Sequence, residues 1–349
     1  MTDLLSSLAY LCGQPVAKAK IKAQPEHFKV TEQLGYDFSG CGEHVMVHIQ
    51  KTGENTSFVA NELAKACGVK SKDIGWAGLK DRHAITKQWF SVYLPGDSLP
   101  NLVAFEKQYP SIQVLEMTRH HKKLRPGDLQ GNHFELMLTE VTEIQDVVQR
   151  LHIVAKQGVP NYFGQQRFGN QGNNLHEARR WGRDNVRSRN ANQRSLYLSA
   201  ARSWIFNHIV SARIQADCFQ RFIDGDIALR NGEQELVQLD QLADINNDLA
   251  AQKVKISAAL AGDNQLPTQG QALTLEQAQL DAEPDLMQLI RGNRMRHERR
   301  AIALLPQEFT WSVDDNMISL SFSLDAGSFA TSVLRELIIE IPVERTYDN

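Results

Sequence analysis

Alternating apolar and polar residues predict several strands in the N-terminal part of the chain. Residues 28–32 and 43–49 alternate in this way on either side of a glycine-containing segment, which predicts a hairpin with a long loop. Residues 88–94 predict a further strand that ends before a Pro-Gly pair. Two more strands are predicted at residues 112–117 and 133–138. Together these segments indicate a sheet.

Helical spacing of apolar residues occurs between and after these strands. Asn55 offers an N-cap for one helix, and Gly68 can close its C-terminus. Thr142 begins a capping-box pattern for a second helix, which ends at Gly158. The predicted apolar stripe of this second helix consists of Ile144, Val148, Leu151 and Ala155. A domain border is therefore expected near Gly158.

The pattern changes in the middle of the chain. Residues 158–305 contain loops rich in Asn and Gly, a predicted helix at 199–218 and an acidic stretch, and they lack the alternation of the first part. The block at 161–169 places three aromatic side chains beside Arg167, a mixture that suits either packing or stacking on bases. These aromatic residues are Tyr162, Phe163 and Phe168. Packing is favoured, because clustered aromatic side chains more often belong to a core.

Alternation returns after Pro306. Residues 318–324 predict a strand, and a helix with an apolar face follows it. We expect this strand to rejoin the N-terminal sheet. Residues 1–157 and 306–349 would then form one discontinuous domain, and residues 158–305 would be inserted into it.

The composition limits the classes of protein to be considered. A chain of 349 residues is long enough for two domains with cores of ordinary size. Its start shows no signal-peptide pattern, and no apolar run reaches membrane-spanning length, so a cytoplasmic protein without a membrane partner is expected. The four cysteines lack the close pairing of a zinc site and are expected to be reduced core residues. The absence of a metal-ligand set and of a nucleotide-binding motif predicts that no metal or nucleotide cofactor is needed.

Basic residues are concentrated in three segments, although the formal net charge is −3. Residues 119–125 contain no acid, and arginines gather at 179–194 and 291–300. Each segment can neutralise phosphates, while any one of them alone is more often a solvated surface. Three such segments in an acidic chain favour an RNA-facing side. The candidates for contacts with an RNA backbone are Arg119, Lys122, Lys123 and Arg125.

Asp81 is the single acid of a glycine-punctuated turn and strand at residues 75–90. Lys80 and Arg82 flank it and His83 follows, and nearby cations favour the ionised form of a carboxyl group. An ionised carboxylate of this kind can act as a nucleophile. The alternative is that Asp81 caps the turn or pairs with its basic neighbours at the surface, and local chemistry alone favours this alternative.

Four sequence blocks favour the interpretation of Asp81 as a nucleophile over its interpretation as a turn cap or a surface ion pair. Residues 78–86, with the sequence Gly-Leu-Lys-Asp-Arg-His-Ala-Ile-Thr, closely resemble the signature of the TruD family of tRNA pseudouridine synthases. Three further blocks resemble the same family in the same order, at residues 22–28, 158–169 and 326–333. Because the blocks reach from near one end of the chain to near the other, the resemblance covers essentially all of it.

The resemblance implies a fold and an activity. The implied fold is α+β, with a pseudouridine synthase-like catalytic domain around a central, largely antiparallel sheet and an inserted α/β TRUD domain. The implied activity is that of an isomerase that converts uridine to pseudouridine at position 13 in the D-arm of tRNA, with glutamate tRNA as the typical substrate. Such an enzyme must expose its target base, usually by flipping it. The sequence does not set the oligomeric state, and a monomer is compatible with it.

The resemblance also implies roles for five residues. Asp81 matches the catalytic nucleophile, and Lys22 matches the basic residue near it. Phe28 and Phe329 match aromatic residues that contact the substrate, and Asn132 matches the polar residue of the substrate site. An amide both donates and accepts hydrogen bonds, which suits the edge of a uracil. Whether the carboxylate attacks the ribose, attacks the base or removes a ribose proton stays open.

The same residues have ordinary interpretations when they are judged without the resemblance. Phe28 and Phe329 are then core residues, and Asn132 is a turn residue. The chain also departs from the family pattern at His27, where an acid is usual, so a salt bridge made there by relatives is not expected here.

Two other classes of protein fit parts of the sequence. A non-catalytic RNA-binding protein could use the basic segments, and changing Asp81 would then leave its behaviour unaltered. A hydrolase with a carboxylate nucleophile could act on small nucleosides, and its binding would ignore salt and RNA folding. The four-block resemblance favours the synthase over both.

Overall fold

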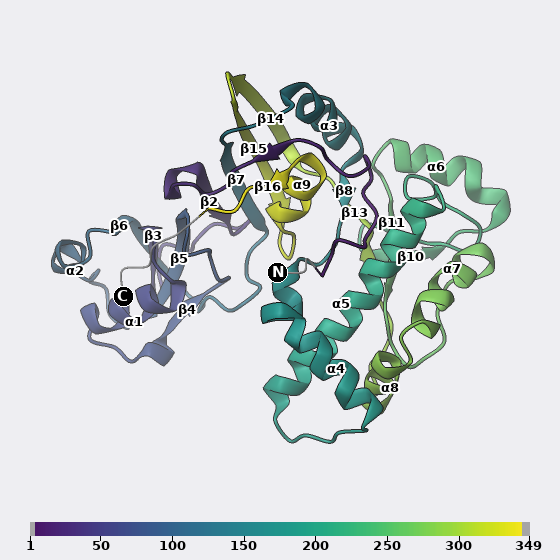
Figure 1. Ribbon diagram of the computed structural model, residues 1–349. Coiled ribbons are helices and arrows are strands. Elements are labelled where there is room, and N and C mark those ends of the chain that lie inside the picture. Colours follow the sequence, from purple (N-terminus) through teal and green to yellow (C-terminus); the bar gives the residue numbers. More distant parts are fainter. Residues whose placement is uncertain (1–3, 344–349) are drawn as a thin grey trace. The chain divides into compact units, whose positions relative to one another are not determined.

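The computed structural model describes residues 4–343, which form two compact units (Figure 1). Each unit draws on separated parts of the chain: the sheet unit on residues 16–148, 306–328 and 338–343, and the helical unit on residues 4–15, 149–305 and 329–337. Within residues 4–343, no helix combines the length and the apolar character needed to cross a membrane.

A large sheet forms the centre of the sheet unit. Its strands are β2 (Phe28–Gln33), β3 (His44–Thr52), β4 (Ile74–Trp76), β5 (Ile85–Tyr93), β6 (Ile112–His120), β7 (Gly131–Leu138), β14 (Gln307–Asp314) and β15 (Met317–Asp325). They lie in the order β14-β15-β7-β2-β5-β3-β6, with β4 paired to β5 beside this path. All neighbours are antiparallel except β2 and β5. The predicted α+β class with a largely antiparallel central sheet is confirmed.

The N-terminal strands occur where alternation predicts them, but one of the predicted pairings is wrong. β2 and β3 do not form a hairpin, because β5 lies between them. Alternation shows which residues of a strand face the core, and it does not show which strand lies alongside. All six residues of β2 pair with β7 on one side, and Lys29, Val30 and Thr31 pair with β5 on the other.

The C-terminal strand β15 carries the predicted alternation. Its buried side chains are Ile318, Leu320, Phe322 and Leu324, each at most 2% exposed. β15 pairs along the whole of β7, and Phe322 lies opposite Phe134 with their ring centroids 5.5 Å apart. The prediction that the C-terminal part rejoins the N-terminal sheet is therefore confirmed.

Two helices and several short elements complete the sheet unit. Helix α1 (Thr56–Ala66) ends before Gly68 as predicted, and its Val59 and Leu63 share a core with Val45 and Val47 of β3. The shorter elements are α2 (Val103–Gln108), the 3₁₀ turns η1 (Pro25–His27) and η2 (Ser71–Asp73), and the parallel strands β1 (Lys18–Ala19) and β16 (Ile339–Glu340).

The predicted helix before Gly158 is present as α3 (Ile144–Gln157), but its buried face differs from the prediction. Val147, Leu151 and Val154 are fully buried, whereas Ile144, Val148 and Ala155 of the predicted stripe are only partly buried. The predicted capping box is also wrong in part. The Thr142 hydroxyl accepts a hydrogen bond from the backbone N–H of Lys18 at 2.8 Å.

The helical unit combines helices with a small sheet. Its helices are α4 (Asn173–Arg183), α5 (Ala191–Gln215), α6 (Leu242–Ala250), α7 (Gly270–Asp281), α8 (Pro284–Gly292) and α9 (Ala330–Leu337), with 3₁₀ turns η3 (Gln165–Phe168), η4 (Asn170–Gly172) and η5 (Leu239–Gln241). Its strands are β8 (Val159–Pro160), β9 (Ile227–Arg230), β10 (Glu233–Leu236), β11 (Lys255–Leu260), β12 (Glu298–Ala301) and β13 (Ala303–Leu304). β10, β9, β11 and β12 form one antiparallel sheet in that order.

Helix α5 runs through the helical unit as its longest element (Figure 1). It begins eight residues before the predicted helix at 199–218, where the Asn190 side chain caps it by accepting from the Gln193 N–H. The three aromatic residues near Arg167 are buried in the same core as α5: Tyr162, Phe163 and Phe168 are 2%, 6% and 0% exposed. The packing interpretation of these residues is confirmed.

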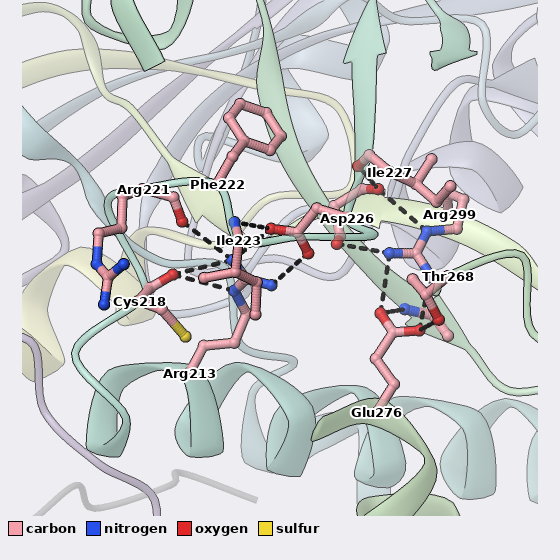
Figure 2. A network of polar contacts seen from close by, with 12 residues as sticks. Arg213, Cys218, Arg221, Phe222, Ile223, Asp226, Ile227, Thr268, Glu276 and Arg299 are labelled. Carbon is pink, nitrogen blue, oxygen red and sulfur yellow. Dashed lines mark hydrogen bonds and ion pairs between the residues drawn. The ribbon is translucent and has the colours of Figure 1, made fainter. Parts of the chain in front are cut away.

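Two buried ion pairs connect elements of the helical unit, Arg213 with Asp226 and Arg299 with Glu276 (Figure 2). Arg213 of α5 donates to both carboxylate oxygens of Asp226, at 2.7 and 2.9 Å, and both side chains are 1% exposed. Arg299 of β12 donates to Glu276 of α7 at 2.9 Å. A buried carboxylate is tolerated when a partner of this geometry neutralises it, so these pairs fix how helix and strand pack.

We expect Asp226→Ala to lower the free energy of unfolding by about 3–5 kcal/mol, because it leaves the Arg213 charge buried without its counter-ion. Urea unfolding followed by tryptophan fluorescence measures the loss, since Trp181 and Trp204 lie in the same core. The control is Asp248→Ala, which breaks a partly exposed pair with Arg230 and should cost much less stability than Asp226→Ala. Equal losses for the two variants would contradict the prediction.

Candidate active site

Asp81 lies in the loop that joins β4 to β5. These two strands are antiparallel neighbours, with Trp76 opposite Phe90, so the loop begins and ends beside the middle of the sheet. Strand β5 also pairs with β2 and with β3. The loop is therefore surrounded by residues from three different strands.

A buried ion pair anchors this loop to β2. The Lys80 ammonium lies 2.6 Å from a carboxylate oxygen of Glu32, and their side chains are 5% and 0% exposed. The second Glu32 oxygen accepts from the backbone N–H of Trp89 at 3.0 Å. Lys80, the residue before Asp81, is thus fixed between β2 and β5.

Two uncharged side chains, Thr56 of α1 and Gln88 of β5, also form hydrogen bonds with the loop backbone. The Thr56 hydroxyl accepts from the backbone N–H of Lys80 at 3.0 Å and donates to Gln88 at 2.9 Å. The Gln88 amide in turn donates to the carbonyl of Gly78 at 3.2 Å. Both side chains are buried, so the loop backbone is held by fixed partners and not by water.

Lys51 of β3 fixes the backbone of Asp81 itself. Its side chain is fully buried, and its ammonium donates to the carbonyl oxygens of Asp81 at 3.0 Å and of Glu54 at 2.6 Å. Burial lowers the pKa of Lys51 to about 8, although the negative charge of Asp81 opposes this shift. Lys51 therefore acts on the position of Asp81 through the main chain.

The Asp81 carboxylate has two partners of its own. One oxygen pairs with the ammonium of Lys22, and the other accepts from the backbone N–H of His83 at 2.9 Å. Burial raises the pKa of the Asp81 carboxyl, but the hydrogen bond and charge of Lys22, with the His83 N–H, outweigh it and hold the pKa below its ordinary value. The side chain is 29% exposed, so this ionised group stays accessible.

Lys22 reaches Asp81 from an unusual backbone conformation. Its φ angle is 54°, in the left-handed region, which costs a residue with a side chain about 1 kcal/mol. Its ammonium also lies 4.1 Å from the centroid of the Phe28 ring. Asp81, Lys22 and Phe28, three of the residues predicted from the sequence, therefore form one group of direct contacts.

Asn132 lies on the same face of the sheet. It is opposite Glu32 in the pairing of β7 with β2, and Phe28 and Glu32 share the buried face of β2. Its side-chain oxygen is buried and has no hydrogen-bond partner within residues 4–343. A buried acceptor without a donor is uncommon and suits an amide that awaits a ligand.

The remaining residues predicted from the sequence are Phe329 and the four candidates for contacts with an RNA backbone. Phe329 belongs to the helical unit, where it is half-buried and directly precedes α9, so its role stays a prediction. Arg119 lies within β6 and is 8% exposed, and its guanidinium donates to the carbonyls of Gly42, Leu94 and Ser98. The Lys123 ammonium donates to the carbonyl of Lys72. Lys122 and Arg125 are exposed.

Sequence reasoning missed the residues that support the Asp81 loop: Glu32, Lys51, Thr56 and Gln88. Two of them carry a signal in the pattern. Lys51 continues the series Val45, Val47 and Ile49, and Glu32 continues Phe28 and Val30, so each places a charge on the buried face of a strand. Charged residues are almost never fully buried without a partner, so such positions indicate a fixed polar site.

Comparisons with known proteins identify the family of this chain. A family model described as tRNA pseudouridine synthase D (TruD) matches residues 5–181 and 183–337. A tRNA pseudouridine synthase D of Vibrio cholerae serotype O1 is 69% identical over 349 residues, which are 100% of this chain and 96% of that protein. One from Vibrio parahaemolyticus is 66% identical over 347 residues, which are 99% and 100% of the two chains. The chain therefore belongs to the TruD family of tRNA pseudouridine synthases.

A solved structure shares the fold. The crystal structure of a Methanosarcina mazei protein assigned as tRNA pseudouridine synthase D (TruD) matches with a TM-score of 0.73 and covers 95% of this chain and 96% of that one. At 21% sequence identity this likeness concerns the fold alone.

Replacing Lys22 should raise the pKa of Asp81. In Lys22→Met the ammonium that lowers this pKa is gone and the effect of burial, which raises it, remains. The pKa is measured from the carboxyl ¹³C shift of Asp81 as a function of pH, with Asp81→Asn used to assign the signal. The control is Lys20→Met, which removes the partner of Glu140 and should leave Asp81 unchanged. An unchanged Asp81 pKa in Lys22→Met would contradict the role given to this ion pair.

Replacing Lys51 should loosen the loop without altering its sequence. Lys51→Met removes the donor that the Asp81 and Glu54 carbonyls share, and we expect the amides of residues 78–84 to exchange hydrogen about tenfold faster, as a lost net hydrogen bond of about 1.4 kcal/mol implies. Hydrogen-exchange mass spectrometry measures this rate. In the control Lys65→Met, which removes an exposed pair on α1, the exchange of this loop should stay at the wild-type rate. If both variants exchange alike, Lys51 does not hold the loop.

Proposed function

We propose that this protein converts uridine to pseudouridine at position 13 in the D-arm of tRNA, with glutamate tRNA as the typical substrate. Asp81 is the catalytic carboxylate. The observation that carries the proposal is the ionised, accessible Asp81 side chain held by Lys22 beside Phe28, in a chain of the TruD family.

The surroundings of Asp81 suit a carboxylate that reacts with a nucleoside. A nucleophile must be ionised at neutral pH, and Lys22 favours that form. It must also keep its position while the substrate binds, and Lys51 and the Lys80–Glu32 pair fix the backbone on both sides of the reacting group. Rejoining the same uracil to the same ribose needs no metal, no nucleotide and no external reductant.

Asn132 and the aromatic residues provide the remaining parts of a uridine site. A target base must leave its stack to reach the carboxylate. The unpaired Asn132 oxygen can accept from the N3–H of uracil, and its amide group can donate to a uracil oxygen. In this proposal Phe28 lies against the substrate on the side of Lys22, and Phe329 contributes the second aromatic contact.

The proposed domains and RNA contacts follow from the same assignment. Residues 1–157 and 306–349 form the catalytic domain, and residues 158–305 form the inserted TRUD domain. Lys122 and Arg125 are exposed and can contact phosphates, with Lys123 beside them, whereas the internal bonds of Arg119 remove it from this set. The enzyme acts in the cytoplasm on tRNA, and a monomer is compatible with this proposal.

Asp81→Asn should bind tRNA with nearly the wild-type dissociation constant and form pseudouridine at least about a thousandfold more slowly, because an amide cannot replace an ionised nucleophile. Pseudouridine is mapped by carbodiimide modification and primer extension on glutamate tRNA, and binding is measured by gel shift. The matched control is Asp97→Asn, an exposed acid of the same unit, which should retain full activity.

Normal pseudouridine formation by Asp81→Asn would remove Asp81 from the mechanism. A wild-type protein that binds tRNA without modifying it would identify a non-catalytic RNA-binding protein. Modification at a uridine other than 13 would keep the reaction and overturn the assigned position.

A further inference from the structure

The helical unit contains a cavity of about 340 Å³ beside the N-terminal half of α5. The serines Ser195, Ser199 and Ser203 line it at intervals of four residues, so they occupy one face of the helix. Arg194 and Arg202 of the same helix also line it, and Leu260 and Met295 contribute apolar walls. The volume lies in the range of sites that hold a small group or part of a larger ligand.

The lining is basic. Among the described residues that line the cavity none is acidic, while two are arginines. Arg194 is exposed, and Arg202 is 9% exposed. The terminal nitrogens of Arg202 donate to the carbonyls of Leu260 and Arg296 and pair with Glu298 at 3.5 Å, whereas its Nε–H has no hydrogen-bond acceptor among residues 4–343. A buried donor of this kind points to an acceptor that the protein itself does not supply.

Two further arginines strengthen the positive charge. The Arg167 guanidinium donates to the Ser199 hydroxyl at 3.1 Å, and the Arg300 guanidinium lies 4.3 Å from the centroid of the Phe163 ring, a residue that also lines the cavity. Burial, together with the charge of Arg167, lowers the pKa of Arg300 to about 10. Cations that destabilise one another in this way are stabilised by an anion between them.

We propose that this cavity binds a phosphate group of the tRNA backbone. Serine hydroxyls and guanidinium groups are the usual donors to phosphodiester oxygens, and the planar guanidinium can donate to two oxygens at once. Arg194 ends the basic segment at residues 179–194, and Met295 belongs to the basic segment at 291–300, so both of these separated segments contribute a residue to the cavity lining. The inference rests on the proposed function, because it requires tRNA as the substrate.

The test compares Arg194→Gln with wild type in tRNA binding as a function of salt. Arg194 is exposed, and among residues 4–343 its side chain bonds only the Ser188 carbonyl, so this variant should fold. We expect the dissociation constant at about 0.15 M salt to rise about tenfold, and the slope of log K against log salt to fall by about 0.7–0.9, the value of one phosphate contact. Ser195→Asp, which adds a negative charge to the same lining, should weaken binding at least as much.

The matched control is Arg230→Gln. Arg230 lies in the same unit, where it pairs with Glu235 and Asp248 away from the cavity lining, so the variant removes the same formal charge. Ethylnitrosourea protection of tRNA phosphates identifies the contact: one phosphate protected by wild type and by Arg230→Gln should lose its protection with Arg194→Gln. Inorganic phosphate alone, added at millimolar concentration, should compete with tRNA much less for Arg194→Gln than for wild type.

The outcomes separate this inference from the proposed function. If wild type forms pseudouridine while Arg194→Gln and Ser195→Asp bind like Arg230→Gln, the phosphate site is wrong and the activity stands. If wild type binds tRNA without modifying it and the two cavity variants bind weakly, the activity is wrong and the phosphate site stands. A wild-type protein that does not bind tRNA overturns both.

Discussion

The ion pair between Lys80 and Glu32 is the constraint on which the candidate active site depends. Both side chains are almost completely buried, so each charge needs the other, and the loss of either partner would leave an uncompensated charge in the interior. The pair joins the Asp81 loop to β2, the strand that carries Phe28 and lies beside β7 with Asn132. One interaction thereby sets the position of the Asp81 carboxylate relative to Phe28 and Asn132, the two candidate substrate-binding residues of the sheet unit.

Two other lysines, Lys22 and Lys51, contact Asp81 in different ways. Lys22 contacts the carboxylate and determines its charge, while Lys51 contacts only main-chain oxygens and determines its place. Because Lys51 contacts the main-chain carbonyl of Asp81 and not its carboxylate, it fixes the residue without occupying the partly exposed side chain. A site built in this way combines a fixed backbone with a side chain whose charge can be tuned separately.

The sequence predicts those features of the fold that depend on the periodic spacing of apolar residues within one segment. Alternation identifies β2, β3, β5 and β15, but the hairpin between β2 and β3 is wrong because pairing is decided by distant residues. The four-residue strands β9, β10 and β12 are too short and too polar to alternate visibly. The strand predicted at residues 112–117 extends to His120 in β6, and Arg119 in this extension donates to carbonyls of the protein itself. Resemblance indicated Asp81, whereas Lys51 becomes evident only when the buried face of β3 is known.

The pairing of β15 with β7 has a consequence for the synthesis of the chain on the ribosome. Strand β7 ends at Leu138, and β15, which pairs along it, begins at Met317, so β7 has one open edge until the later segment has been synthesised. At a translation rate of about 5–20 residues per second, that interval lasts on the order of 10–40 s. Open edges invite pairing with other nascent chains, so the period in which chaperones protect this protein should be set by the length of the intervening segment.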